Sequence, residues 1–182
     1  YNNVSGPTAS SIYFTGFNDQ VGTVQNLADD DGSDWIGFQQ TGTGAIARSA
    51  QDKMRDSVSV KDFGAVGDGV TNDAAAIQLA IDSSDGFIYF PPGEYLVSTQ
   101  IVLPSSSFYS DEKVRGFTGS AATIIAGVEN GHIVSGPASG YASRWLFENL
   151  TYISKTGIAY AGIFDVTTIY NSWFSHNSFT NI

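Results

Sequence analysis

The stretch VSVKDFGAVGDGVTNDAAAIQLAID, from Val58 to Asp82, decides the fold of this chain. It begins with alternating apolar and polar residues, as a strand does, and continues through Gly64, Gly67 and Gly69. It ends with alanines and isoleucines at helical spacing, which predict a helix with one narrow apolar stripe. Glycine-rich turns between a strand and a helix often bind phosphate, so a nucleotide site is the first hypothesis to test.

The glycine spacing does not fit the phosphate-binding motifs. A P-loop needs a lysine directly after its last glycine, and none follows here. The order is Gly64-x-x-Gly67-x-Gly69, which is not the Gly-x-Gly-x-x-Gly of dinucleotide sites, and Asp68 would repel a pyrophosphate. We therefore predict no nucleotide and no other cofactor. The glycines instead let the chain turn sharply, so that the helix folds back across a strand end.

The polar residues around this helix start have structural explanations. Thr71 or Asn72 is expected to cap the helix, and Asp73 in the first turn suits the positive end of the helix dipole. Asp68 is expected to accept hydrogen bonds within its own turn. Asp68 and Asp73 are therefore interpreted as hydrogen-bonding and capping residues rather than as catalytic ones.

Composition narrows the possible functions. The chain has 182 residues, enough for one domain or for a small module before a larger one, and 42% of them are apolar, enough for a core. With 18 acidic and 8 basic residues the net charge is −10, which argues against nucleic acids and anionic membrane surfaces. The absence of cysteine excludes disulfides, cysteine-bound zinc and thiol nucleophiles. No membrane insertion is expected, since no apolar run approaches the ~20 residues of a membrane span, and YNNVSGPTAS does not read as a signal peptide.

The N-terminal region is poor in large apolar residues. Residues 1–47 contain two short apolar pieces, 11–17 and 34–40, which predict strands, followed by a glycine-rich linker. About 40 residues of this kind are close to the lower limit for independent folding, so we expect contacts with other chains to stabilise them. Residues 48–56 lack Gly and Pro and predict a short exposed or trimer-lining helix with Met54 on its buried side.

Downstream of the helix the pattern is that of short strands. The segment 87–97 predicts two strands around a turn at Pro91–Gly93, and no second helix is expected after Ile101. Further strands are predicted at 123–128, 132–136, 145–154 and 161–182. Asparagines occur at strand ends, among them Asn149 and Asn171, 22 residues apart. Such a period, with Asn in corners where it tolerates the left-handed conformation, is typical of a parallel β-solenoid.

One family resemblance is specific. SVKDFGAVGDGVTNDAAAIQLAID, followed by IYFPPGEYLV, resembles the opening of right-handed β-helix proteins of the pectin-lyase-like superfamily, in the form found in bacteriophage tailspikes. GTGAIARSAQDKMRDSVSVKDFGAVGDG is similar to the phage-type junction between a virion-binding part and the β-helix. The resemblance is specific over residues 42–103, extends only in style over 104–182, and only in position and length over 1–41.

The resemblance implies a mainly β protein that opens a helix-capped, right-handed parallel β-helix. Its parts would be a virion-attachment module at 1–47, a neck helix and linker at 48–57, and the first β-helix coils at 58–182. In such proteins the helix covers the open end of the solenoid, which would otherwise expose apolar side chains and strand edges. Ile77 and Ile81 should then face the first coil.

Partners and location also follow from the resemblance. It implies a homotrimer in the phage tail, extracellular on host contact, that binds tail or baseplate adaptor proteins through residues 1–56. Regions downstream would bind bacterial surface polysaccharide and, in the complete protein, depolymerise it. One alternative is a non-enzymatic structural or branching tail fibre, or an adhesin. Another is a secreted polygalacturonase-like glycosidase, for which sequons at Asn3 and Asn149 would permit glycosylation.

The candidate chemical groups have no visible partners in the sequence. The carboxylates of the β-region do not repeat at the coil period and are interpreted as surface charges: Asp111, Glu112, Glu129, Glu148 and Asp165. Two of them, Glu148 and Asp165, could still meet a neighbouring chain's carboxylate across a trimer interface. His132 and His176 stand alone, and Leu27–Trp35 is acidic without EF-hand spacing, which favours a tight turn. We therefore assign no catalytic, cofactor-binding or metal-binding residue.

Overall fold

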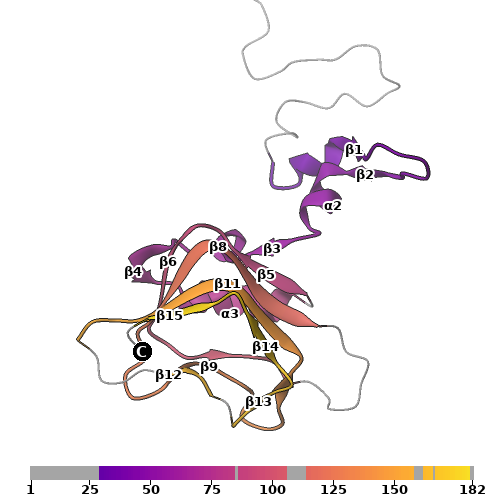
Figure 1. The fold of residues 1–182 in the computed structure, drawn as a ribbon. Helices are drawn as coiled ribbons and strands as arrows, with labels where there is room; N and C mark the ends of the chain where they lie inside the picture. Colours follow the sequence, from indigo (N-terminus) through magenta and orange to yellow (C-terminus); the bar gives the residue numbers. More distant parts are fainter. Residues whose placement is uncertain (1–28, 85, 106–113, 158–161, 166, 181–182) are drawn as a thin grey trace, which may run out of the picture. The chain divides into compact units, whose positions relative to one another are not determined.

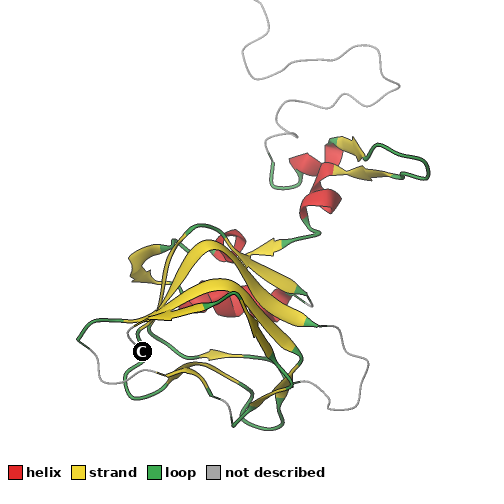
Figure 2. Ribbon diagram, in the orientation of Figure 1, coloured by secondary structure: helices red, strands yellow, loops and turns green. Residues whose placement is uncertain are grey.

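The chain forms two compact units, Tyr1–Asp56 and Ser57–Ile182 (Figure 1). The structure is a computed structural model, and the residues it describes are 29–84, 86–105, 114–157, 162–165 and 167–180. The strand predicted at 11–17 lies outside these residues. Strands predominate and helices are few (Figure 2). Among the described residues no helix has the length and apolar character needed to cross a bilayer.

In the first unit, residues 29–56 form a hairpin with two short helices. Its elements are η1 (Gly32–Trp35), β1 (Gly37–Gln39), β2 (Ala47–Ser49) and α2 (Ala50–Met54). The strands β1 and β2 pair antiparallel, with Gly37 opposite Ser49. The strand predicted at 34–40 is therefore shorter than expected, because a 3-10 turn occupies its first residues. The predicted linker is the loop of this hairpin, where Gly42 and Gly44 have positive φ.

The helix α2 is held at its start by a cap and along its side by ion pairs. The Ser49 hydroxyl accepts a hydrogen bond from the Asp52 amide at 3.1 Å. The Arg48 guanidinium lies 2.6 Å from the Asp52 carboxylate and 2.7 Å from that of Asp56. The hydrogen bonds of Asp56 with Arg48 and with Lys53, at 2.8 Å, hold the pKa of Asp56 well below its usual range. No residue of α2 is buried, and Met54 is 59% exposed. Met54 is therefore not buried within a single chain, and its burial on the side of the helix that would line a trimer stays a prediction.

The second unit is a stack of parallel strands. Its elements before the first long strand are β3 (Val58–Ser59), η2 (Val60–Phe63), β4 (Asp68–Asn72), α3 (Ala74–Ser83), β5 (Phe87–Phe90), β6 (Gly93–Val97) and β7 (Ile101–Val102). Then follow β8 (Arg115–Ala126), β9 (His132–Ser135), β10 (Ala142–Ser143), β11 (Trp145–Ser154), β12 (Gly162–Phe164), β13 (Ile169–Tyr170), β14 (Trp173–Ser175) and β15 (Ser178–Thr180). The longest sheet has the order β14-β11-β8-β5-β3, and a separate sheet has the order β12-β9-β7 (Figure 1). All strand pairs in this unit are parallel, as the coils of a β-helix require.

The length of a coil follows from the register of the long sheet. Thr151 pairs with Ser178, and the Leu150 amide donates to the Asn177 side chain across the same separation of 27 residues. The period of 22 residues expected from Asn149 and Asn171 is therefore wrong.

The two asparagines belong to different corners of the solenoid. Asn149 has φ 56 and falls in register with the corner residues Ala121 and His176, each at φ 53. Asn171, at φ 45, falls in register with Arg144, at φ 61. The expectation that asparagine forms corners in the left-handed conformation is confirmed. Asn149 and Asn171, however, do not repeat one corner in successive coils.

The cap helix α3 lies against the first coil as predicted. Its buried residues are Ala74, Ile77, Ala80 and Ile81, all on one face. The strand predicted ahead of it ends at Ser59, because Ser59 and Asp62 form a capping box that begins the 3-10 helix η2. The helix starts one residue later than expected, with Asp73 as the N-cap residue and Asn72 inside β4.

The loop ahead of α3 is organised by two carboxylates. Asp73 is buried, and its side chain accepts hydrogen bonds from the backbone amides of Val66 at 2.7 Å and Gly67 at 3.1 Å. Gly67 has φ +70, and a Cβ there would lie 3.0 Å from the Tyr95 ring. Asp68 accepts from the amides that follow it in the turn, which holds its pKa below the usual range. The hydrogen-bonding roles expected for Asp68 and Asp73 are confirmed.

Aromatic rings of successive coils contact one another, edge to face between Phe117 and Phe147 and stacked where Phe147 and Tyr152 meet rings of the last coil. Phe117 and Phe147 lie 5.2 Å apart between ring centroids, and Phe147 and Phe174 lie 5.1 Å apart. A second stack places Tyr152 5.2 Å from Phe179. Such contacts add to the free energy gained by burial, so the stacks hold successive coils in register.

Two buried tyrosines differ in whether the hydroxyl has a hydrogen-bond partner, so removing the hydroxyl should affect the free energy of unfolding differently. Burial raises the pKa of Tyr95 to about 12, and its hydroxyl donates to the Pro91 carbonyl at 2.8 Å. Burial also raises the pKa of Tyr152, whose hydroxyl has no hydrogen-bond partner among the described residues. Tyr95→Phe should lower the free energy of unfolding by about 1 kcal/mol, whereas Tyr152→Phe should leave it unchanged or raise it. Urea titration of both variants measures the difference, and equal losses would contradict it.

Candidate functional site on the outer face of the long sheet

The outer face of the long sheet carries two parallel columns of side chains. Along each strand the inward residues are buried, so the residues between them point outward. The apolar column, in register from coil to coil, consists of Phe87, Gly116, Leu146 and Trp173. The polar column, two residues further along each strand, consists of Tyr89, Thr118, Glu148 and Ser175. Parallel pairing thus places like chemistry side by side over four coils.

The apolar column has a flat section. A Cβ on Gly116 would lie 3.0 Å from the Phe87 ring and would collide with the Leu146 carbonyl oxygen. The Phe87 ring therefore lies over Gly116, where no side chain projects. Phe87 is 42% exposed and Trp173 is 51% exposed. With neighbouring strands about 4.8 Å apart, the column extends for roughly 14 Å.

The last two residues of the polar column, Glu148 and Ser175, lie next to an imidazole, that of His176. The Glu148 carboxylate lies 3.9 Å from His176 Nδ1, and the Ser175 hydroxyl lies 2.7 Å from the same nitrogen. The side chains of Glu148 and His176 are 34% and 77% exposed. The expectation that His176 stands alone is wrong, because Glu148 pairs with Ser175, the residue before His176. A search for polar residues 27 positions apart would have found the Glu148–Ser175 pair.

This arrangement suits binding better than cleavage. In a Ser-His-acid triad the serine and the acid contact opposite ring nitrogens, whereas Ser175 and Glu148 both lie on the Nδ1 side of His176. Glycoside hydrolysis uses two facing carboxyls, but the neighbours of Glu148 in the polar column are Thr118 and Ser175. That no residue of this chain is catalytic stays a prediction.

The other candidate groups have structural partners. Asp165 accepts hydrogen bonds from the Thr167 hydroxyl at 2.6 Å and the Thr167 amide at 3.0 Å, and these hold the pKa of Asp165 below its usual range. The His132 ring lies against Gly162, where a side chain would collide with it. Glu129 is exposed. Within the described parts of the chain, no three His, Asp or Glu side chains gather where they could hold a metal ion.

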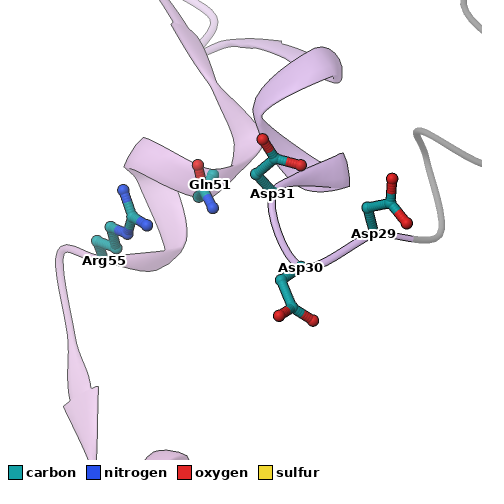
Figure 3. Close-up of a pocket in the computed structure, with 5 residues that line it drawn as sticks. All are labelled: Asp29, Asp30, Asp31, Gln51 and Arg55. Atoms are coloured by element: carbon teal, nitrogen blue, oxygen red, sulfur yellow. The ribbon is translucent and has the colours of Figure 1, made fainter.

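Two further predictions concern acidic segments. Asp111 and Glu112 lie outside the described residues. In the acidic turn of the first unit, the Gly32 amide donates to the Asp29 carbonyl at 2.9 Å. Figure 3 shows the shallow pocket beside it, lined by Asp29, Asp30, Asp31, Gln51 and Arg55. The Asp30 carboxylate points away from those of Asp29 and Asp31 (Figure 3).

Comparison with known proteins identifies the second unit. Residues 57–167, more than half of the chain, match the family described as rhamnogalacturonase A/epimerase, pectate lyase-like. The chain belongs to this family. The predicted membership of the pectin-lyase-like superfamily is thereby confirmed.

Curated relatives of this pectate lyase-like chain match parts of it. Mannuronan C5-epimerase AlgE6 of Azotobacter vinelandii is 59% identical over 44 residues, which are 22% of this chain and 5% of the epimerase. Plasmin and fibronectin-binding protein A of Streptococcus pneumoniae is 50% identical over 78 residues, which are 40% of this chain and 10% of that protein. The chain therefore spans a small fraction of the length of these relatives.

Solved structures share the pectate lyase-like fold over most of the chain. Tailspike protein 3 of bacteriophage CBA120 aligns with a TM-score of 0.60 and 22% identity over 85% of this chain and 27% of its own. The tailspike protein of Acinetobacter baumannii phage AM24 aligns with a TM-score of 0.62 and 19% identity over 81% of this chain and 25% of its own. The predicted fold class, a helix-capped right-handed β-helix behind a small β module, is confirmed.

Proposed function

We propose that this chain is the virion-proximal part of a phage tailspike. Residues 1–47 attach the spike to the virion, residues 48–57 form its neck, and residues 58–182 cap and begin the β-helix. In the complete spike the β-helix binds and depolymerises bacterial surface polysaccharide. The spike is part of the phage tail and meets the host from outside the cell.

The observation that carries this proposal is the order of the two units. The described residues of the first unit bury almost no apolar side chains, and this unit precedes a β-helix whose first coil is closed by α3. A closed end needs no further coil ahead of it, so the preceding unit is free to bind another protein. The same fold extends over 85% of this chain in the CBA120 tailspike.

Attachment is tested by comparing residues 1–182 with residues 57–182. We expect the longer chain to be retained by purified phage tails or by the isolated baseplate adaptor, and the shorter chain to pass through. The shorter chain keeps the whole family match, so it controls for binding by the β-helix. Equal retention of the two chains would overturn the attachment role.

A parallel homotrimer is the assembly that we expect. The first unit exposes apolar side chains that its small size cannot bury, each between 51% and 79% exposed: Trp35, Ile36, Ile46 and Met54. Sedimentation of the chain should give the trimer mass, and Ile46→Asp with Met54→Asp should shift it toward monomer. Thr43→Asp, in the exposed hairpin loop, is the matched control. A folded parent that sediments only as a monomer contradicts this expectation.

A non-enzymatic adhesin is the second candidate. It is favoured by the 50% identity to the streptococcal plasmin and fibronectin-binding protein A. An adhesin of that kind would bind immobilised plasmin or fibronectin, whereas a tailspike part would bind phage tails. Surface plasmon resonance of the chain against the three partners decides between the candidates.

A further inference from the structure

We propose that the outer face of the long sheet binds an uncharged glycan. The apolar column stacks on the C–H faces of the sugar rings, and the polar column hydrogen-bonds their hydroxyl groups. This inference rests on the proposed tailspike function and deepens it. It names the class of glycan and places a binding site on the first coils, whereas our sequence interpretation placed polysaccharide binding downstream of this chain.

The shape of the apolar column fits a chain of rings. Phe87 lies over Gly116, and Trp173 is exposed at the other end of the column, with Leu146 between them. Aromatic faces at both ends bury the apolar faces of sugar rings at little cost in side-chain entropy. Because each coil repeats the column at a fixed strand spacing, the surface suits a repeating polymer better than a compact ligand.

The polar column supplies hydrogen-bonding groups of the kind that sugar hydroxyls need. Glu148 accepts only, so its partly exposed carboxylate pairs with hydroxyl donors. The hydroxyls of Thr118 and Ser175 flank Glu148 on the neighbouring strands and can both donate and accept. The His176 ring lies beside Glu148, with Nδ1 3.9 Å from the carboxylate, and adds a ring nitrogen to this group of polar side chains.

Repulsion between like charges favours an uncharged glycan over a polyuronate. The central group is the Glu148 carboxylate, and the net charge of the chain is −10, so a polymer with one carboxylate per sugar would be repelled. Mannuronan, which the related epimerases carry in their name, is such a polymer. The positive charges nearest to the two columns in the sequence are Arg115, one residue before Gly116, and Arg144, two residues before Leu146. They make an anionic glycan the alternative that the experiment has to separate.

The test measures binding of the 182-residue chain to purified bacterial surface polysaccharides, arrayed as an uncharged set and a uronate-containing set. At least one uncharged polysaccharide should bind and change the fluorescence of the exposed Trp173. Trp173→Ala and Glu148→Gln should each weaken that binding by at least about tenfold. Val70→Ala, an exposed apolar residue on β4 away from the columns, should leave it unchanged.

Three outcomes overturn the proposal. They are binding confined to uronate polymers, no binding to any uncharged polysaccharide, and binding that Trp173→Ala and Glu148→Gln leave unchanged. Circular dichroism of each variant shows whether it is folded, and Trp173→Phe should retain most of the affinity. If retention on phage tails persists while glycan binding is absent, only this inference fails. If glycan binding persists while retention is absent, the tailspike role fails.

Discussion

Ile77→Asp is expected to lower the free energy of unfolding of the β-helix by about 3–5 kcal/mol. Ile77 is fully buried on the face of α3 that covers the first coil, together with Ala80 and Ile81. An aspartate there would place an unpaired carboxylate among apolar side chains, and it would also remove the apolar contacts of the isoleucine. The expected result is a large drop in the midpoint of urea unfolding, followed by tryptophan fluorescence.

Leu79→Asp is the matched control for this experiment. Leu79 lies in the same helix, two residues away, but its side chain is 53% exposed. The substitution there introduces the same charge and, because leucine favours helices more than isoleucine, at least as large a loss of helix propensity, yet it should alter stability by no more than about 1 kcal/mol. If Ile77→Asp unfolded at the same urea concentration as Leu79→Asp, α3 would not be covering a core.

Features that depend on local pattern were predictable from the sequence. The apolar stripe of α3 identified Ile77 and Ile81 as buried, and the alternation over 145–154 gave the bounds of β11. Each of these two patterns is contained in about ten consecutive residues, so the spacing of apolar residues along the chain reports burial directly. The capping box of Ser59 and Asp62 was also local, yet it was read as a continuous strand.

The site depends on register, which no local pattern contains. Glu148 meets His176 because parallel pairing brings Ser175 opposite Glu148, and the number of residues in the intervening corners sets that pairing. A coil of 22 residues, as inferred from Asn149 and Asn171, would have put Tyr170 rather than Ser175 opposite Glu148. Once one pair of strands is aligned, the same register predicts both columns.

The exposure of Met54 in the first unit could not be predicted from the sequence either, and the reason is a different one. The helix α2 has the composition of a surface helix apart from Met54, which was expected to lie on a buried side. In the part of this unit that the structure describes, residues 29–56, a five-residue helix on a two-stranded hairpin offers no second layer to cover that residue. Whether Met54 is buried therefore depends on other copies of the chain, which is the question that sedimentation addresses.

Asp73→Ala is expected to destabilise the cap of the β-helix by about 2–3 kcal/mol. The buried Asp73 carboxylate accepts hydrogen bonds from the amides of Val66 and Gly67 and thereby holds the glycine turn against the start of α3. Removing the carboxylate leaves two amide donors without their acceptor in a partly buried loop. Asp73→Asn keeps one acceptor oxygen and should lose less, about 1–2 kcal/mol.

The matched control is Asp82→Ala, which removes an exposed carboxylate near the other end of the same helix. That carboxylate accepts one hydrogen bond, from Gln78 at 3.0 Å, and its charge is unfavourable at a helix C-terminus. Its loss should therefore change stability by less than about 0.5 kcal/mol. The order Asp73→Ala, then Asp73→Asn, then Asp82→Ala in urea midpoints would show that the turn ahead of α3 is held by this carboxylate. Equal midpoints for Asp73→Ala and Asp82→Ala would show that the glycine turn keeps its shape without the carboxylate, and that the hydrogen bonds of Asp73 contribute nothing to the cap.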